Sequence, residues 1–177
     1  METEYEIRAL EINKEDIIKK LEELGAIKKG EFKQKRYVYD LKPIEKGKWI
    51  RLRTNGMVTT LTYKDIVSDT IDGTKEVEFE VEDFNKANEF LEKIGFESRS
   101  YQENIRIQYI LNDVEIDIDS WPMIPTYMEI EGKSEEEVIK MKKILDIDED
   151  KFTALNCDEI YKQIYGIDIS KIRDLKF

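Results

Sequence analysis

Polar and apolar residues alternate in several short stretches of this chain, beginning with Glu4–Arg8 near its start. Because successive side chains of a β-strand point to opposite faces, this alternation predicts strands with one charged and one apolar face. Asn55-Gly56, between two such stretches, is typical of a hairpin turn. We predict strands at about 2–11, 31–40, 48–54, 58–64, 75–82, 99–111, 114–120 and 126–131.

Apolar residues recur at helical spacing in four other segments. Asn13 is a suitable N-cap for the first of these helices, and Gly25 a suitable stop. Gly95 and Gly166 stand at the ends of the second and the fourth. We predict helices between 13 and 25 and at about 84–94, 135–145 and 157–165.

The two halves of the chain are similar at an offset of 70 residues. Leu21–Gly25 corresponds to Leu91–Gly95, and Glu6, Arg36 and Tyr39 fall on Glu76, Arg106 and Tyr109. Each half reads as a strand, a helix, a strand and a two-stranded unit. Eight strands in this arrangement could close into a barrel with helices outside. We expect one domain over residues 1–177, with a core at about 2–145 and a C-terminal helical extension at about 146–177.

Charge and composition exclude several classes of function. The net charge of −11 disfavours binding to nucleic acid or to an anionic membrane surface. The chain has no histidine and only one cysteine, Cys157, which excludes histidine-dependent triads, histidine-bound zinc and an internal disulfide. Without a recognisable signal peptide or a long apolar run, we expect a soluble cytoplasmic protein.

The charged faces of the predicted strands are largely segregated by sign. Arginine binds phosphate oxygens in a bidentate manner, and paired carboxylates suit hard divalent cations. If the strands converge, the economical ligand is a polyphosphate bridged to Mg²⁺ or Mn²⁺. The alternative is a sheet whose charged face lies in water and is stabilised by cross-strand pairs. The acidic strands supply Glu4, Glu6, Glu76, Glu78, Glu80, Glu115, Asp117, Asp119, Glu129 and Glu131, and the basic ones Arg8, Arg51, Arg53, Lys64 and Arg106.

Taken in order, these residues resemble the signature of the CYTH superfamily, the triphosphate tunnel metalloenzymes. Glu4-x-Glu6-x-Arg8 is similar to the ExExK motif of that superfamily. The other matching pieces are Arg51-x-Arg53, Thr62-x-Lys64, Glu76-x-Glu78, Arg106-x-x-Tyr109 and Asp119 followed by Glu129-x-Glu131. The resemblance covers about residues 2–145 and implies an α+β fold, an eight-stranded antiparallel tunnel with helices packed outside.

The resemblance also implies roles for individual residues. The metal-side carboxylates would be Glu4, Glu6, Asp119, Glu129 and Glu131, and the phosphate-binding residues Arg8, Arg51, Arg53, Lys64 and Arg106. Arg8 and Glu78 would be catalytic, and Glu76 and Glu78 would balance the basic side chains or help to bind metal. The cofactor would be Mg²⁺ or Mn²⁺.

The activities implied are those of class IV adenylyl cyclase, thiamine triphosphatase and inorganic tripolyphosphatase. The layout resembles the cyclase branch most, which implies conversion of ATP to cyclic AMP and pyrophosphate. Hydrolysis of thiamine triphosphate or tripolyphosphate is the alternative, and a binding protein without turnover is another. A fourth is a structural barrel whose charges only pair with one another.

Two departures from the family pattern bear on this choice. The last position of ExExK is Arg8, and a guanidinium cannot act as a general base. A position that is usually basic, two residues before Arg106, is Asn104. The last predicted helix, near Tyr161 and Tyr165, would either plug one end of the tunnel or pack a homodimer.

Overall fold

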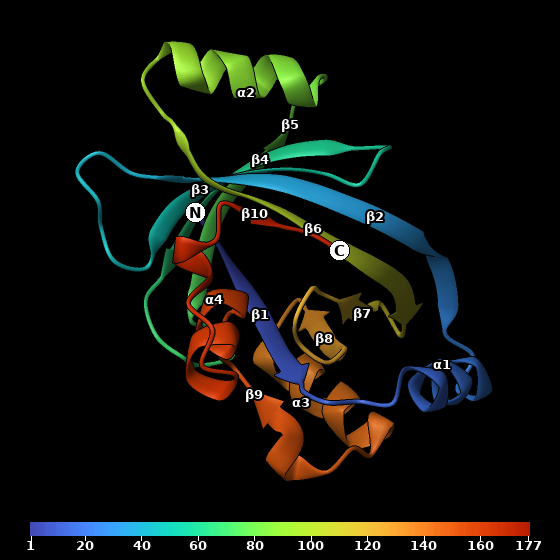
Figure 1. The fold of residues 1–177 in the computed structure, drawn as a ribbon. Coiled ribbons are helices and arrows are strands. Elements are labelled where there is room, and N and C mark those ends of the chain that lie inside the picture. Colours follow the sequence, from blue (N-terminus) through green and yellow to red (C-terminus); the bar gives the residue numbers. More distant parts are fainter.

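Eight antiparallel strands close into a barrel in the computed structural model, which describes residues Met1–Phe177 (Figure 1). The strands are β1 (Glu2–Ala9), β2 (Ile27–Asp40), β3 (Lys48–Thr54), β4 (Thr59–Ile66), β5 (Thr74–Glu80), β6 (Ser98–Leu111), β7 (Val114–Ser120) and β8 (Tyr127–Gly132). Around the barrel they are paired in the order β1, β5, β4, β3, β2, β6, β7 and β8, which returns to β1. The predicted α+β barrel is therefore confirmed.

The order of the strands has the two-fold relation that the 70-residue offset predicts. Exchanging β1–β4 with β5–β8 leaves the list of neighbours unchanged. As a result β5 joins β2–β4 of the first half, while β1 joins β6–β8 of the second. Each sheet is thus completed by the opposite half of the chain.

The helices are α1 (Lys14–Glu23), α2 (Phe84–Lys93), α3 (Glu135–Leu145) and the single turn α4 (Cys157–Glu159). Asn13 caps α1 through its side chain, as predicted. The fourth predicted helix differs, because α4 continues as a π-helical turn over Ile160–Ile164. Two short strands follow α3: β9 (Phe152–Thr153) pairs with β1, and β10 (Asp174–Leu175) runs parallel to β6. None of the helices is long and apolar enough to cross a membrane.

Strand β2 begins at Ile27, four residues earlier than its alternation predicts. A bulge between Lys28 and Gly30 shifts the register against β6. Because a bulge inserts a residue and breaks the period of two, the first part of the strand does not show the expected pattern.

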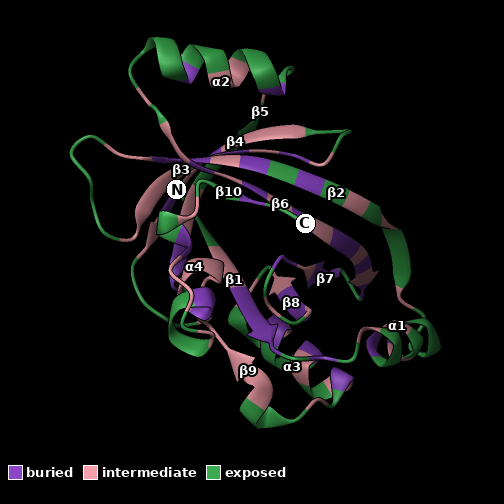
Figure 2. Cartoon of the chain, viewed as in Figure 1, coloured by how far each residue is buried: buried purple, intermediate pink, exposed green.

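The main apolar core lies outside the barrel wall. Ile116 on β7 and Ile130 on β8 are fully buried against α1 and α3, and Val138 and Leu145 are the facing residues of α3. On the opposite side, α2 packs over Tyr39 and other residues of β2 and β3 (Figures 1 and 2). Helices cover the outward apolar faces of most strands, whereas Val77 and Phe79 of β5 are exposed. The alternate charged faces turn inward.

We expect Leu145→Ala to destabilise the protein by about 2–5 kcal/mol, because it opens a cavity between α3 and the barrel. Ile139→Ala on the same helix is the control, since Ile139 is 37% exposed. Urea unfolding of both variants measures the difference. Equal losses would show that α3 does not cover the barrel as described.

Candidate active site

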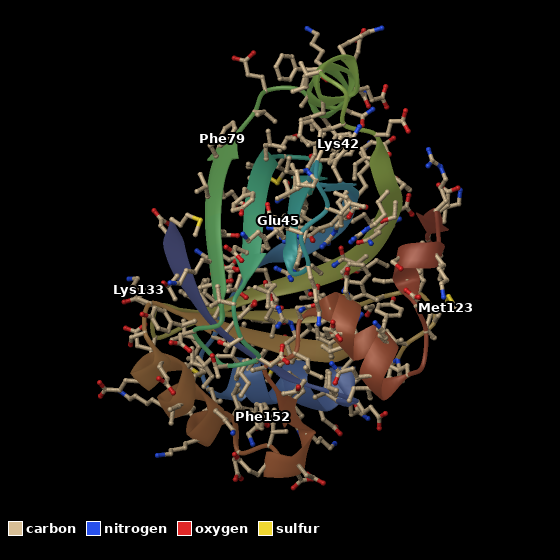
Figure 3. The ribbon with its side chains drawn as sticks, turned by 90° about the vertical axis from the view of Figure 1, so that its left-hand side faces the viewer. Lys42, Glu45, Phe79, Met123, Lys133 and Phe152 are labelled. Carbon is tan, nitrogen blue, oxygen red and sulfur yellow. The ribbon has the colours of Figure 1, made fainter.

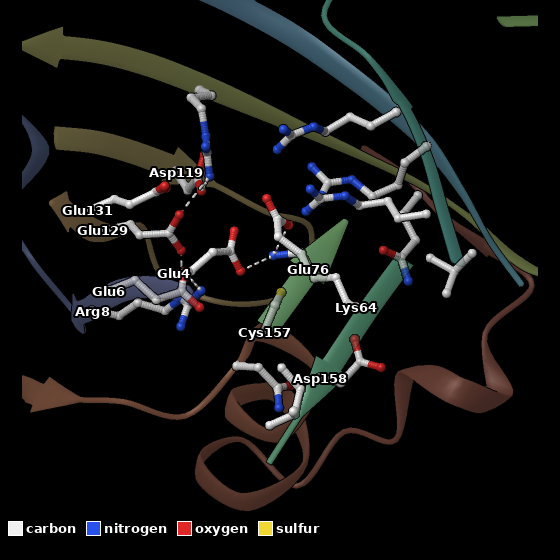
Figure 4. A pocket seen from close by; sticks show the side chains of 18 of the residues that line it. Glu4, Glu6, Arg8, Lys64, Glu76, Asp119, Glu129, Glu131, Cys157 and Asp158 are labelled. Carbon is white, nitrogen blue, oxygen red and sulfur yellow. Dashed lines mark hydrogen bonds and ion pairs between the residues drawn. The ribbon is translucent and has the colours of Figure 1, made fainter. Parts of the chain in front are cut away.

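The interior of the barrel contains a charged cavity of about 280 Å³ (Figure 4). Six cations and nine carboxylates line it, so that negative charge is in excess. Polar side chains from most of the strands crowd the same space (Figure 3). All of the predicted site residues line this one cavity: Glu4, Glu6, Arg8, Arg51, Arg53, Lys64, Glu78, Arg106, Asp119, Glu129 and Glu131.

Strand register brings these residues together. On the acidic side, β1 and β8 place Glu6 opposite Glu131 and Arg8 opposite Glu129. On the basic side, Arg51, Thr62 and Glu78 form one row across β3, β4 and β5. These pairings are fixed by the outward apolar residues, because a slip of one residue would turn the charged faces outward.

Glu129 holds two buried arginines together. Its carboxylate lies 2.7 Å from Arg8 Nε and 3.3 Å from Arg106 Nη2. Burial opposes ionisation of Glu129, but the charges of Arg8, Arg106 and Lys64 outweigh it and lower its pKa to about 2. Arg8 also binds Glu6 at 2.6 Å.

Arg106 is surrounded by acids. It donates two hydrogen bonds to Asp119, from Nε to Oδ1 at 2.9 Å and from Nη2 to Oδ2 at 2.6 Å. Its Nη1 contacts the buried Asp117. Sequence reasoning assigned Arg8 and Arg106 to phosphate binding. In the structure both arginines are paired with carboxylates, and they neutralise part of the charge of the acidic side.

Lys64 lies between two acids of neighbouring strands. Its ammonium is 2.5 Å from Glu4 Oε2 and 3.2 Å from Glu76 Oε2 (Figure 4). It therefore stands at the boundary between the acidic and the basic side of the cavity.

Glu78 organises the basic side. Its Oε2 accepts hydrogen bonds from Thr62 Oγ1 at 2.5 Å and from Arg51 Nη2 at 3.2 Å, and lies 3.9 Å from Arg53 Nη2. Burial alone would raise the pKa of Glu78, but the hydrogen bond from Thr62 and the charges of Arg51 and Arg53 have the larger effect. The net pKa is lowered, so Glu78 is ionised. A carboxylate in this environment is suited to hold two arginines rather than to accept a proton.

Glu131, like Glu115, is a carboxylate of the acidic side that makes no ion pair. Burial, and then the charges of Glu129, Glu4, Glu6 and Glu115, raise its pKa to about 8. Figure 4 shows Glu4, Glu6, Glu129 and Glu131 gathered on this side. Oxygen donors with uncompensated charge fit a hard divalent cation such as Mg²⁺ or Mn²⁺. No three acids are already arranged as a metal site, since arginines and Lys64 hold several of them.

Three features of the cavity were not predicted. Arg36 on β2 lines it, although the 70-residue offset to Arg106 was a signal for it. Gln102 of β6 faces Arg36 across the strands. Asn156, Cys157 and Asp158 also line it, although the expected plug was placed farther along, in the helix near Tyr161 and Tyr165.

The C-terminal segment closes part of the cavity. Arg8 Nη1 donates a hydrogen bond to the carbonyl of Leu155 at 3.1 Å, and Asn156, Cys157 and Asp158 line the wall. Burial raises the pKa of the Cys157 thiol to about 12, so it is not a reactive thiolate. The sequence left two roles open for this segment, to plug one end of the tunnel or to pack a homodimer. The structure shows that it contacts the cavity.

The two tryptophans that line the cavity differ in how far their rings are covered by other residues. Trp121 is buried against Tyr161, and the guanidinium of Arg36 lies 4.6 Å from the centre of its ring. Trp121 is therefore packed and does not offer an open ring for stacking. Trp49 is half-buried and lines the cavity from β3.

Comparison with known proteins gives a family match and several structural neighbours. A family profile described as CYTH domain matches residues 2–153. No curated protein matches the sequence. The PH1012 protein of Pyrococcus horikoshii OT3 is 27% identical, with a TM-score of 0.74 over 86% of this chain and 96% of that one.

Two further neighbours show the fold alone, because their identity is low. A "putative adenylate cyclase" from Vibrio parahaemolyticus is 15% identical, with a TM-score of 0.76 over 94% of this chain and 99% of that one. HpAC1 from Hippeastrum, described as revealing a dominant triphosphatase activity, is 14% identical, with a TM-score of 0.61 over 94% and 96%.

The two neighbouring carboxylates of β8 should respond oppositely to neutralisation. In the presence of a chelator at pH 7, Glu129→Gln should destabilise the protein by roughly 3 kcal/mol, because an ionised group with a pKa near 2 is lost. Glu131→Gln should leave stability unchanged or raise it, because its pKa near 8 shows that its charge is disfavoured.

The pH dependence of stability follows from the lowered pKa of Glu129. The pKa of Glu129 falls on folding from 4.5 to about 2, so its contribution is complete above pH 4.5 and is lost as the pH falls toward 2. Urea unfolding of wild type and Glu129→Gln should therefore converge over this range. Equal effects of the two substitutions at pH 7 would contradict the described charge balance.

Proposed function

The chain belongs to the CYTH domain family, and we propose that it is a divalent-metal-dependent enzyme that hydrolyses a compact triphosphate. Members of this family typically act on triphosphates with divalent metal ions. One observation carries the proposal for this chain: one cavity inside the barrel joins a cluster of arginines to a cluster of carboxylates in excess.

The basic side supplies the phosphate-binding groups. Arg51 and Arg53 lie next to each other on one face of β3 and share only Glu78 as an ionic partner. Burial, followed by repulsion from Arg51 and Arg106, lowers the pKa of Arg53 to about 10, so the cluster favours an added anion. Lys64 would bind a further phosphate oxygen as a point charge.

The acidic side supplies the metal-binding groups. Glu4, Glu6, Glu129 and Glu131 would hold Mg²⁺ or Mn²⁺, with Asp119 behind them. A bound ion of this kind neutralises charge on the phosphate chain and on the displaced group. Since carboxylates outnumber cations in the cavity, a polyanion would need that added charge to bind.

The remaining groups position the others. Arg8 and Arg106 hold the orientation of Glu6, Glu129 and Asp119, and Glu78 aligns Arg51 with Arg53. Hydrolysis breaks the bond between the terminal phosphorus and its bridging oxygen as water attacks in line. The arginines and Lys64 stabilise the charge that develops on the phosphate oxygens.

Cavity size and lining favour a small substrate such as tripolyphosphate. A volume of about 280 Å³ is slightly below the usual range for ligand sites, and one face of the Trp121 ring is covered by Arg36. The second candidate is cyclisation of ATP or hydrolysis of thiamine triphosphate. Half-buried Trp49 favours it, as a ring against which an organic group would stack.

Product analysis tests the proposal. Tripolyphosphate, thiamine triphosphate and ATP are each incubated with the protein and Mg²⁺ or Mn²⁺, and orthophosphate, pyrophosphate and cyclic AMP are measured. Orthophosphate from tripolyphosphate is the expected result. Pyrophosphate with cyclic AMP would identify a cyclase instead, and binding without any product would identify a binding protein.

Metal removal should abolish turnover. With EDTA we expect no measurable release of orthophosphate, because the acidic side then repels the substrate, and added Mn²⁺ or Mg²⁺ should restore it. Undiminished release in EDTA would contradict the assignment of the carboxylates to a metal.

Arg53→Ala should weaken binding of tripolyphosphate in the presence of Mg²⁺ by roughly 10- to 100-fold, because a charge-assisted hydrogen bond is lost. Arg173→Ala, outside the barrel, is the matched control and should bind like the wild type. Titration calorimetry measures both. Wild-type affinity in Arg53→Ala would remove this arginine from the phosphate site.

A further inference from the structure

Arg36 differs from every other cation of the cavity because it has no acidic partner. Arg8, Arg51, Arg53, Lys64 and Arg106 each lie within ion-pair distance of at least one carboxylate. Arg36 makes no ion pair, although it is only 7% exposed. A buried charge without a counter-charge is costly, so packing alone gives no reason for a guanidinium here.

The neighbours of Arg36 increase this cost. Strand register places it directly opposite Arg53, and like charges in such a pair repel each other. Burial, and then the charges of Arg53, Arg51 and Arg106, lower the pKa of Arg36 to about 9. Glu78 compensates part of the charge of Arg51 and Arg53, so the charge of Arg36 adds to a positive excess at this end of the cavity.

The guanidinium is nevertheless held in one place. Its central carbon lies over the ring of Trp121, and Nη2 donates to Gln34 Oε1 at 2.9 Å and to Asn104 Oδ1. Asn104 in turn donates from Nδ2 to Asp119 Oδ1 at 3.0 Å. Nε of Arg36 is buried without a hydrogen-bond partner. These contacts orient the group and leave donor capacity unused.

We propose that Arg36 is a further substrate-binding residue, which joins Arg51 and Arg53 in a three-arginine cradle for one phosphate group of the ligand. This inference rests on the proposed function, because it assumes an anion in the same cavity. A phosphate group supplies the missing counter-charge and acceptors for the unused donors. Asn104 is then a positioning residue, since it links the cradle to Asp119 on the acidic side.

Arg36→Met tests the proposal because Met keeps much of the apolar volume over Trp121 but removes the charge. With Mg²⁺ and tripolyphosphate, titration calorimetry should give a dissociation constant roughly 10- to 100-fold higher than that of the wild type. In EDTA without ligand, the thermal unfolding midpoint should stay equal or rise, because an unpaired buried charge is gone. Arg36→Lys should retain part of the affinity.

A second-site variant checks the geometry independently. Because the guanidinium rests on the amide of Asn104, a cation introduced there would occupy the same end of the cavity. The double variant Arg36→Met with Asn104→Lys should therefore recover most of the lost affinity. An Arg36→Met variant that binds like the wild type, fails to fold or unfolds at a clearly lower temperature would overturn the proposal and leave a structural role.

The outcomes separate this inference from the proposed function. If the wild type binds tripolyphosphate without turning it over, and Arg36→Met binds it weakly, the enzymatic proposal fails and the cradle stands. If both proteins bind and hydrolyse tripolyphosphate equally, the cradle fails and the enzymatic proposal stands. If the wild type does not bind tripolyphosphate with Mg²⁺ or Mn²⁺, both fail.

Discussion

The balance of buried charge is the constraint on which the rest of the structure depends. Fifteen charged side chains line one cavity inside a closed barrel, where each unpaired charge would cost several kcal/mol. Strand register meets this constraint on the acidic side, because it sets Arg8 opposite Glu129 and Arg106 opposite Asp119. Glu131 and Glu115 among the acids, and Arg36 among the bases, make no ion pair. These are the positions at which a cation and an anion would add most to stability.

The charged interior is tolerated because the apolar core that stabilises the fold lies outside the barrel wall. The strands turn their apolar residues outward, where α1, α2 and α3 cover most of them, although Val77 and Phe79 of β5 stay exposed. The C-terminal segment packs around Trp121 and Tyr161. The last segment also reaches the cavity, since the carbonyl of Leu155 binds Arg8. Stability and ligand binding are therefore divided between the two faces of the same strands.

Much of the fold and of the site could be predicted from periodicity, because a period of two specifies both faces of a strand. Alternation placed Glu4, Arg51 and Glu129 on the charged faces of their strands, and only the family resemblance implied that these faces line a cavity, as they do. The bulge near Gly30 and the π-helical turn at Ile160 could not be predicted, since both break regular spacing. The ion-pair partners of the charged residues could not be predicted either, because they depend on which strands become neighbours.

The measurement that tests these conclusions most directly is a crystal structure with Mn²⁺ and tripolyphosphate, with anomalous scattering used to locate the metal. We predict a manganese peak among Glu4, Glu6, Glu129 and Glu131, with the phosphate chain extending from it to Arg51 and Arg53. A manganese ion bound only outside the cavity, or phosphates bound away from these arginines, would contradict the assignment of the cavity as a metal-dependent triphosphate site.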